Sequence, residues 1–205
     1  MASLTQYCKD LLYRTRYGLT QAECEKGVLD ACAFFGIPAP RAIEDLTNQP
    51  GGRTMFKNYN PESYEDDILC YNLREMKNLG MTGPVGFTAI FTHECAHRVL
   101  QNTTLPGVSL GQWEQELAAD FFMGVRAGLE AQDITSIVAA LSRTQGCGSH
   151  PTGKIREQYA KYGLFEGRRH LIQHRNGSVP EYISLFLEYR SNHYDELHDA
   201  ELTAY

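Results

Sequence analysis

The segment Gly86–Asn102 reads GFTAIFTHECAHRVLQN, and it contains the pattern H-E-x-x-H at His93, Glu94 and His97. On a helix, residues four apart lie on the same face, one turn from each other. His93 and His97 can therefore direct both imidazoles at one point, where a zinc ion needs nitrogens at roughly 2.0–2.1 Å. Glu94 lies about 100° round the helix. It is too far away to be a third ligand, but close enough to take a proton from a water at the metal.

Apolar residues surround the two histidines, as on a helix that packs into a core. They are Phe87, Ile90, Phe91, Cys95, Val99 and Leu100. The helix breaker Gly83-Pro84 precedes the segment and Asn102 ends it, so we expect a helix over about 86–102. The same pattern also arises by chance on ordinary buried helices, and a metal site therefore requires a third ligand.

A candidate third ligand lies on the next predicted helix, which opens at a capping box at Ser109 and continues to about Ala127. Glu116 and Asp120 are four residues apart and share a face. An apolar stripe runs beside them, formed by Leu117, Phe121 and Val125. Two carboxylates next to such a stripe favour a buried cation, and a solvated acidic face is the alternative.

With Glu116, the donors become two imidazoles and one carboxylate, which leaves the fourth position of a zinc ion for water. This is the catalytic arrangement, whereas structural zinc sites are closed by four protein ligands. We expect Asp120 to accept the second ring N–H of a ligand histidine, His93 in preference to His97, and so to fix its tautomer. Zn²⁺ is the predicted cofactor.

The two motifs together resemble those of the gluzincin metallopeptidases. H-E-x-x-H followed by E-x-x-A-D at 116–120 is most similar to the HtpX-like branch and its small soluble minigluzincin relatives. Ser149-His150-Pro151 with Arg156 resembles the His-Pro…Arg element downstream in that branch. These motifs cover roughly residues 86–156 of the chain.

The resemblance implies a zincin-type active-site helix and peptide hydrolysis, with Glu94 as the general base. The zinc ligands that it implies are His93, His97 and Glu116. It also places His150 and Arg156 near the active-site cleft. His150 is then a candidate catalytic donor to the oxyanion formed when water attacks a carbonyl, or else a surface neighbour of a helix start.

Three further alternatives follow from the residues of this region. Arg156 either orients the loop before it or is an exposed helix charge. Cys147 is a loop thiol that either reaches the zinc or has no such role. The interval from His97 to Glu116 is short and also fits the compact ImmA/IrrE-like peptidases, which cleave one regulatory protein. A non-catalytic zinc-binding interaction module is the remaining alternative, in which the metal is structural.

The remaining pattern predicts an α+β fold in a single domain over residues 1–205, predominantly helical, with a small β-meander. Helices are expected within 1–36, the sheet within 37–80, the zinc-site helices within 86–128 and further helices within 133–205. Capping signals start a helix at Thr20-Gln21-Ala22-Glu23 and end it at Gly36. A later helix is expected to start with Pro151 and to end at Gly163. The expected strands are Arg41–Leu46, Arg53–Tyr59 and Asp67–Leu73, and the last of these is the candidate for peptide binding by edge addition.

Composition narrows the function classes. The chain has 205 residues, 42% of them hydrophobic and 21% charged, and its net charge of −6 argues against general nucleic-acid binding. Its start lacks the apolar stretch of a signal peptide, and no apolar run approaches the ~20 residues that span a bilayer. We therefore expect a cytoplasmic protein with six reduced cysteines and a peptide or protein substrate. The sequence leaves the oligomeric state open.

Overall fold

The computed structural model confirms a predominantly helical α+β fold. Its residue contacts divide the chain into two compact units, 1–98 and 99–205, and the division falls inside one helix. The expectation of one domain over the whole chain stays a prediction, and each unit is described by itself. The residues that the structure describes are 4–45, 55–57, 67–78, 80–102, 109–144, 146, 150–175 and 177–197.

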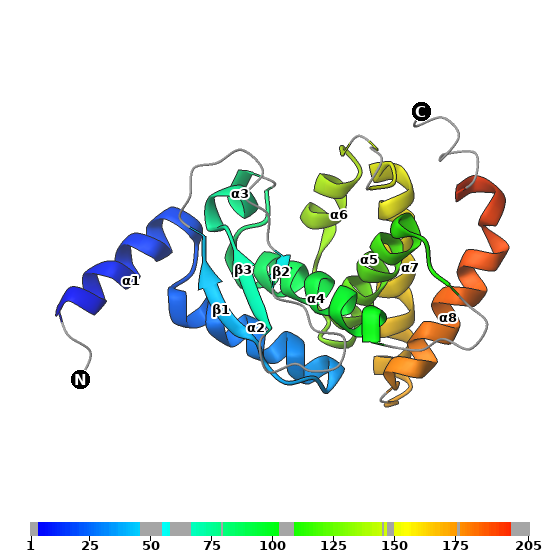
Figure 1. The fold of residues 1–205 in the computed structure, drawn as a ribbon, viewed down its shortest axis with the longest axis horizontal. Helices are drawn as coiled ribbons and strands as arrows, with labels where there is room; N and C mark the ends of the chain where they lie inside the picture. The colour runs from blue at the N-terminus through cyan, green and yellow to red at the C-terminus, as the bar shows by residue number, and fades with distance from the viewer. Residues whose placement is uncertain are drawn as a thin grey trace. The chain divides into compact units, whose positions relative to one another are not determined.

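The described residues form eight helices and three strands (Figure 1). The helices are α1 (Leu4–Tyr17), α2 (Gln21–Phe35), α3 (Leu73–Asn78), α4 (Gly83–Asn102), α5 (Gln112–Leu129), α6 (Thr135–Leu141), α7 (Gly153–Ile172) and α8 (Val179–Asn192). The strands are β1 (Arg41–Glu44), β2 (Met55–Lys57) and β3 (Ile68–Tyr71). In the described parts of the chain, no helix has the length and apolar character needed to cross a bilayer.

The sheet of the first unit has the strand order β1-β3-β2, which corrects the predicted meander. β1 pairs with β3 in parallel, with Arg41 opposite Ile68, and β2 pairs with β3 antiparallel, with Met55 opposite Cys70. A meander joins sequential antiparallel neighbours, whereas a parallel pair needs a crossover between its strands. β3 lies in the centre, where a strand pairs its backbone on both sides, and it is more buried than β1.

The same strand order overturns the prediction that Asp67–Leu73 binds a peptide at its edge. Leu69 of β3 pairs with Ala42 on one side and with Phe56 on the other. Edge addition requires a row of backbone N–H and C=O groups that no other strand uses. A peptide that extends this sheet would therefore pair with β1 or β2.

The predicted limits of α2 are confirmed. Thr20 caps its first turn, and the backbone N–H of Thr20 donates in return to the Glu23 carboxylate at 2.6 Å. Gly36 ends the helix at a φ of 67°, a left-handed conformation that glycine adopts without a Cβ clash. A Cβ at Gly27 would lie 3.2 Å from the Phe91 ring of α4, so a small residue lets these helices approach closely.

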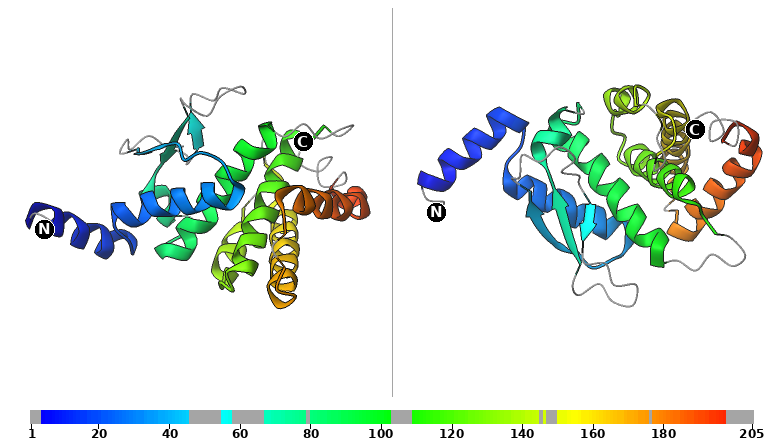
Figure 2. Two further views of the ribbon diagram at one scale, coloured as in Figure 1. Left: turned by 90° about the horizontal axis from the view of Figure 1, so that it is seen from below. Right: turned by 45° about the horizontal axis from the view of Figure 1, so that its top comes forward.

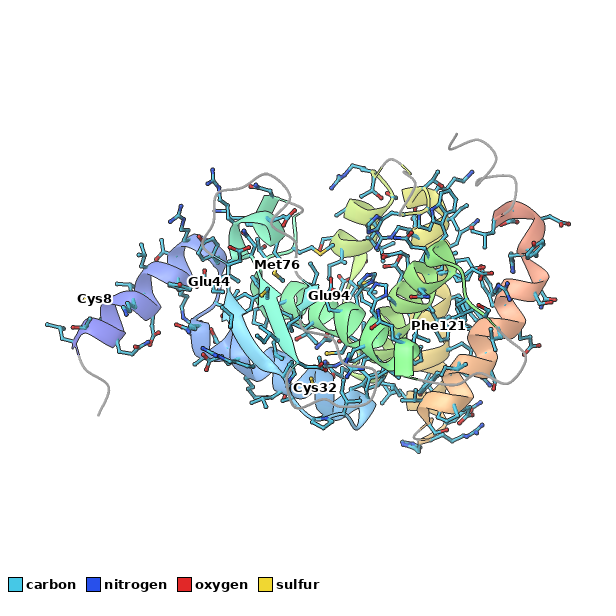
Figure 3. All side chains as sticks on the ribbon, in the orientation of Figure 1. Cys8, Cys32, Glu44, Met76, Glu94 and Phe121 are labelled. Atoms are coloured by element: carbon cyan, nitrogen blue, oxygen red, sulfur yellow. The ribbon has the colours of Figure 1, made fainter. Side chains whose placement is uncertain are left out.

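In the second unit, α5 and α7 pack along each other (Figure 2). A Cβ at Gly163 of α7 would lie 2.0 Å from the Phe121 carbonyl oxygen of α5. Gly124, Gly128 and Gly167 meet the facing backbone in the same way. The prediction that a helix ends at Gly163 was therefore wrong, because α7 continues to Ile172 and uses this glycine for contact. The side chain of Phe121 is buried beside this contact (Figure 3).

Three helix starts differ from the prediction. The N-cap of α5 is Gly111, whose N–H donates to Glu114 at 2.7 Å, so Ser109 does not have this role. α7 begins at Gly153 rather than at Pro151, because Thr152 is the N-cap and has an extended backbone. α4 starts at residue 83, three residues before the predicted start.

Candidate metal centre

Helix α4 brings the two motif histidines together. The Nε2 atoms of His93 and His97 are 3.1 Å apart, and the rings meet edge to face with centroids 4.7 Å apart. Two nitrogens that bind one tetrahedral ion at roughly 2.0–2.1 Å lie about 3.3 Å from each other. The separation in the structure is close to that value, so both imidazoles can bind a common ion.

The third donor is Glu116 on α5. One ligand atom from each of His93, His97 and Glu116 lies within 4.8 Å of the other two. The Glu116 side chain is 12% exposed, and both histidines are half-buried. Two imidazoles and one carboxylate at this spacing form a group that could hold a metal ion.

Arg156 supports the acidic side of the centre within the second unit. Its Nε and Nη2 atoms donate to the two carboxylate oxygens of Asp120 at 2.7 and 3.0 Å. Its Nη2 also lies 3.8 Å from Oε2 of Glu116. A two-point pair between a guanidinium and a carboxylate fixes the orientation of both groups. Arg156 therefore offsets the cost of burying two carboxylates on one face of α5.

The positions of the other predicted site residues decide between some of the alternatives that the sequence left open. The Arg156 side chain is only 11% exposed, which excludes the exposed helix charge. Nε2 of His150 lies 3.5 Å from Oε1 of Glu116, so this histidine adjoins the candidate ligand. Asp120 uses both oxygens toward Arg156, and its expected bond to His93 stays a prediction. Cys147 lies outside the described residues.

Glu94 follows the first motif histidine on α4 and is half-buried (Figure 3). One residue along a helix is a rotation of about 100°, so its carboxylate leaves the helix on a different face from the two imidazoles. This placement fits a group that acts beside an ion rather than one that binds it.

Sequence reasoning did not single out Arg98, which follows His97 directly. Its side chain is fully buried in the first unit, and Nε donates to Oδ2 of Asp67 at 2.5 Å. Asp67 precedes β3, so this ion pair ties the helical turn that carries His97 to the sheet. An arginine inside the apolar run of α4 was a signal for a buried partner. The sequence did not identify that partner, which lies 31 positions away.

No family model, curated protein or solved structure matches this chain. The likeness to gluzincins therefore rests on the motif residues and on the grouping of His93, His97 and Glu116.

Proposed function

We propose that the chain is a zinc-dependent metallopeptidase that hydrolyses peptide bonds with Glu94 as general base. The observation that carries this proposal is the grouping of two imidazoles and one carboxylate within reach of one ion. Three protein donors of this kind are typical of catalytic zinc sites, because they leave a coordination position for water or substrate.

The donor chemistry favours zinc over the other common divalent ions. Mg²⁺ and Ca²⁺ prefer sites made of oxygen atoms, whereas imidazole nitrogen suits zinc and neighbouring transition metals. Two of the three donors in this group are imidazoles. Zinc also needs no redox partner and accepts the tetrahedral arrangement that three side chains and a water provide.

Each nearby side chain then has a defined task. When bound, zinc supplies a Lewis acid and makes a neighbouring water easier to deprotonate. Glu94 accepts a proton from the attacking water and later gives it to the leaving amine. His150 donates a hydrogen bond to the oxygen that becomes negative during attack. Arg156 and Asp120 keep the Glu116 carboxylate in place.

Zinc content and peptide hydrolysis, measured on the same preparations, test the proposal. Glu94→Gln should keep its zinc and lose at least about 100-fold in rate, since the base is removed and no donor is touched. Glu116→Ala should lose both zinc affinity and activity. Glu157→Ala, a carboxylate change elsewhere in the second unit, is the control and should change neither. Undiminished hydrolysis by Glu94→Gln would exclude this residue as the base.

A structural zinc site in an interaction module is the second candidate. It is favoured by His150, whose Nε2 is 3.5 Å from Glu116 and can close the fourth position. Cobalt replacing zinc reports the donors through its visible spectrum. A spectrum that responds to added hydroxamate indicates an open position and supports the peptidase. A spectrum that ignores the inhibitor but changes in His150→Ala or Cys147→Ser indicates a closed, structural site.

A further inference from the structure

Helix α1 presents its apolar side chains to solvent. None of its 14 described residues is buried. The large apolar side chains exposed on it, each more than half accessible, are Leu4, Tyr7, Leu11 and Leu12. Helices that pack on a core normally point such residues inward, so α1 has the reverse orientation.

The exposed side chains form one continuous face. Leu4, Tyr7 and Leu11 follow the i, i+3, i+7 spacing of a helical stripe, and Leu12 widens it. The opposite side of α1 contacts the rest of the first unit through Tyr13, an aromatic residue with a polar tip. The Tyr13 hydroxyl donates to the Glu44 carboxylate at the end of β1, and both groups are part-buried. These contacts fix which face of the helix points outward.

Basic residues flank the apolar face on both sides. Arg16 and Lys9 lie roughly 110–130° from its centre on one side. Arg14 lies about 90° from the centre on the other side, where its guanidinium also pairs with the Glu23 carboxylate of α2 at 3.0 Å. The only acidic residue of α1 is Asp10, which lies about 130° from the centre on the side of Arg14 and accepts a hydrogen bond from Gln6. The helix therefore carries three cationic groups against one anionic group, although the whole chain has a net charge of −6.

We propose that α1 docks this unit onto an anionic lipid surface. A helix with a leucine-rich and aromatic face between lysine and arginine side chains lies in the plane of a membrane interface, with the apolar face among the acyl chains. The long basic side chains bury their methylene stems and reach the lipid phosphates with their charged ends. Docking of this kind needs no membrane-spanning helix.

Charge favours an anionic lipid surface over a second copy of α1 or an acidic protein groove as the partner of this apolar face. Two copies of α1 that paired in parallel through their apolar faces would place Arg14 and Arg16 of one copy near the same residues of the other, and like charges oppose that contact. An antiparallel pair would offer these arginines no anionic group of α1 other than Asp10. An acidic protein groove would satisfy the charges, but would also have to match a face more than two turns long. A lipid surface supplies both the negative charge and the apolar depth without a matching shape.

Sedimentation of the full chain with unilamellar vesicles tests the proposal, using phosphatidylcholine alone or mixed with phosphatidylglycerol. The chain should partition onto the mixed vesicles and much less onto phosphatidylcholine, and added salt should weaken the binding. Leu11→Gln should lower the partition coefficient about tenfold, because one leucine leaves the acyl region. Leu29→Gln on α2 is the matched control, since both leucines are 55% exposed, and should bind as the parent does.

Arg16→Gln tests the charge in the same assay and should weaken binding only to the mixed vesicles, while Lys154→Gln on α7 should not. Far-UV circular dichroism of each variant verifies its fold. Failure of the parent chain to bind mixed vesicles would overturn the proposal, as would equal loss for Leu11→Gln and Leu29→Gln. A dimer in light scattering that Leu11→Gln dissociates, without vesicle binding, would assign the face to a second copy instead.

Discussion

Arg156 pairs with the acidic residues beside the candidate metal centre. It donates two hydrogen bonds to Asp120 and stands 3.8 Å from Glu116, and all three side chains are largely buried. Carboxylates in such surroundings need a counter-charge while the ion is absent, during folding or after metal loss. The arginine supplies it from α7, so the donor geometry does not depend on the ion alone.

We predict that Arg156→Met lowers the free energy of unfolding by about 3–5 kcal/mol, because it removes one partner of a buried ion pair. Chemical denaturation with and without a chelator measures this change. The control is Lys161→Met, whose ammonium pairs with Glu157 and is 62% exposed, and which should cost less than about 1 kcal/mol. If both variants lowered the free energy of unfolding equally, the buried Arg156 pair would stabilise the fold no more than the exposed Lys161 pair.

At the level of elements, the glycines of α5 and α7 let two helix backbones approach more closely than side chains normally allow. The Cβ positions of Gly124 and Gly163 would lie within 2.1 Å of a facing carbonyl oxygen. Asp120 and Arg156 sit on these same two helices, so the close approach also brings the ion pair together. The packing of two helices thereby determines the geometry around Glu116.

Gly163→Ala tests this packing. The added methyl group would collide with the Phe121 carbonyl, and α7 would have to shift, at a cost of about 1–3 kcal/mol or more. Gly111→Ala is the control, because a Cβ there meets only Glu114 at an ordinary 3.6 Å, and it should cost less than about 1 kcal/mol. Thermal unfolding followed by circular dichroism compares them. A Gly163→Ala protein as stable as its parent would refute the close contact.

The capping box of α2 predicts a dependence on pH. The Thr20 backbone N–H holds the pKa of the Glu23 carboxyl below its ordinary value, with Arg14 adding to the effect. A lowered pKa in the folded chain means that this stabilisation is present above the unfolded value and is lost as the pH falls through the folded one. Glu23→Gln, which removes the titrating carboxyl, should cost about 1 kcal/mol or less at pH 7 and still less below pH 4, as measured by chemical denaturation. An unchanged difference between parent and variant over this range would contradict the prediction.

At the scale of the whole molecule, the candidate ligands come from parts of the sequence with no local connection. His93 and His97 are one helical turn apart on α4, whereas Glu116 lies 19 positions after His97 on α5. A ligand that binds the folded chain and not the unfolded chain raises the free energy of unfolding by RT ln(1 + [L]/Kd), where [L] is the free ligand concentration. Metal binding is therefore expected to stabilise the folded state as a whole.

Zinc at 100 times its dissociation constant should raise the free energy of unfolding by about 2.7 kcal/mol, and EDTA should remove that gain. Differential scanning calorimetry of the chain with zinc and with EDTA measures it. In Glu116→Ala the gain should largely disappear, while Glu157→Ala should retain it. If zinc shifts the melting temperature of Glu116→Ala as much as that of the parent, Glu116 is not a ligand.

Local patterns in the sequence were sufficient to predict the structural features that depend only on residues close together in the chain. The i, i+4 spacing brought His93 and His97 together, and the cap at Thr20 and the stop at Gly36 gave the limits of α2. Glu116 was selected from its face on a helix, and the structure groups it with both histidines. These inferences succeeded because helical periodicity and capping act over one or two turns.

Only the tertiary structure decided the features that depend on distant partners. It placed β3 between two strands, continued α7 past Gly163, and gave Asp120 the partner Arg156. Each outcome depends on what lies across an interface, such as a facing carbonyl, a second strand or a guanidinium 36 positions away. Sequence periodicity describes one helix or strand at a time. Strand order, helix length and the pairing of distant side chains depend on the packing energies between elements.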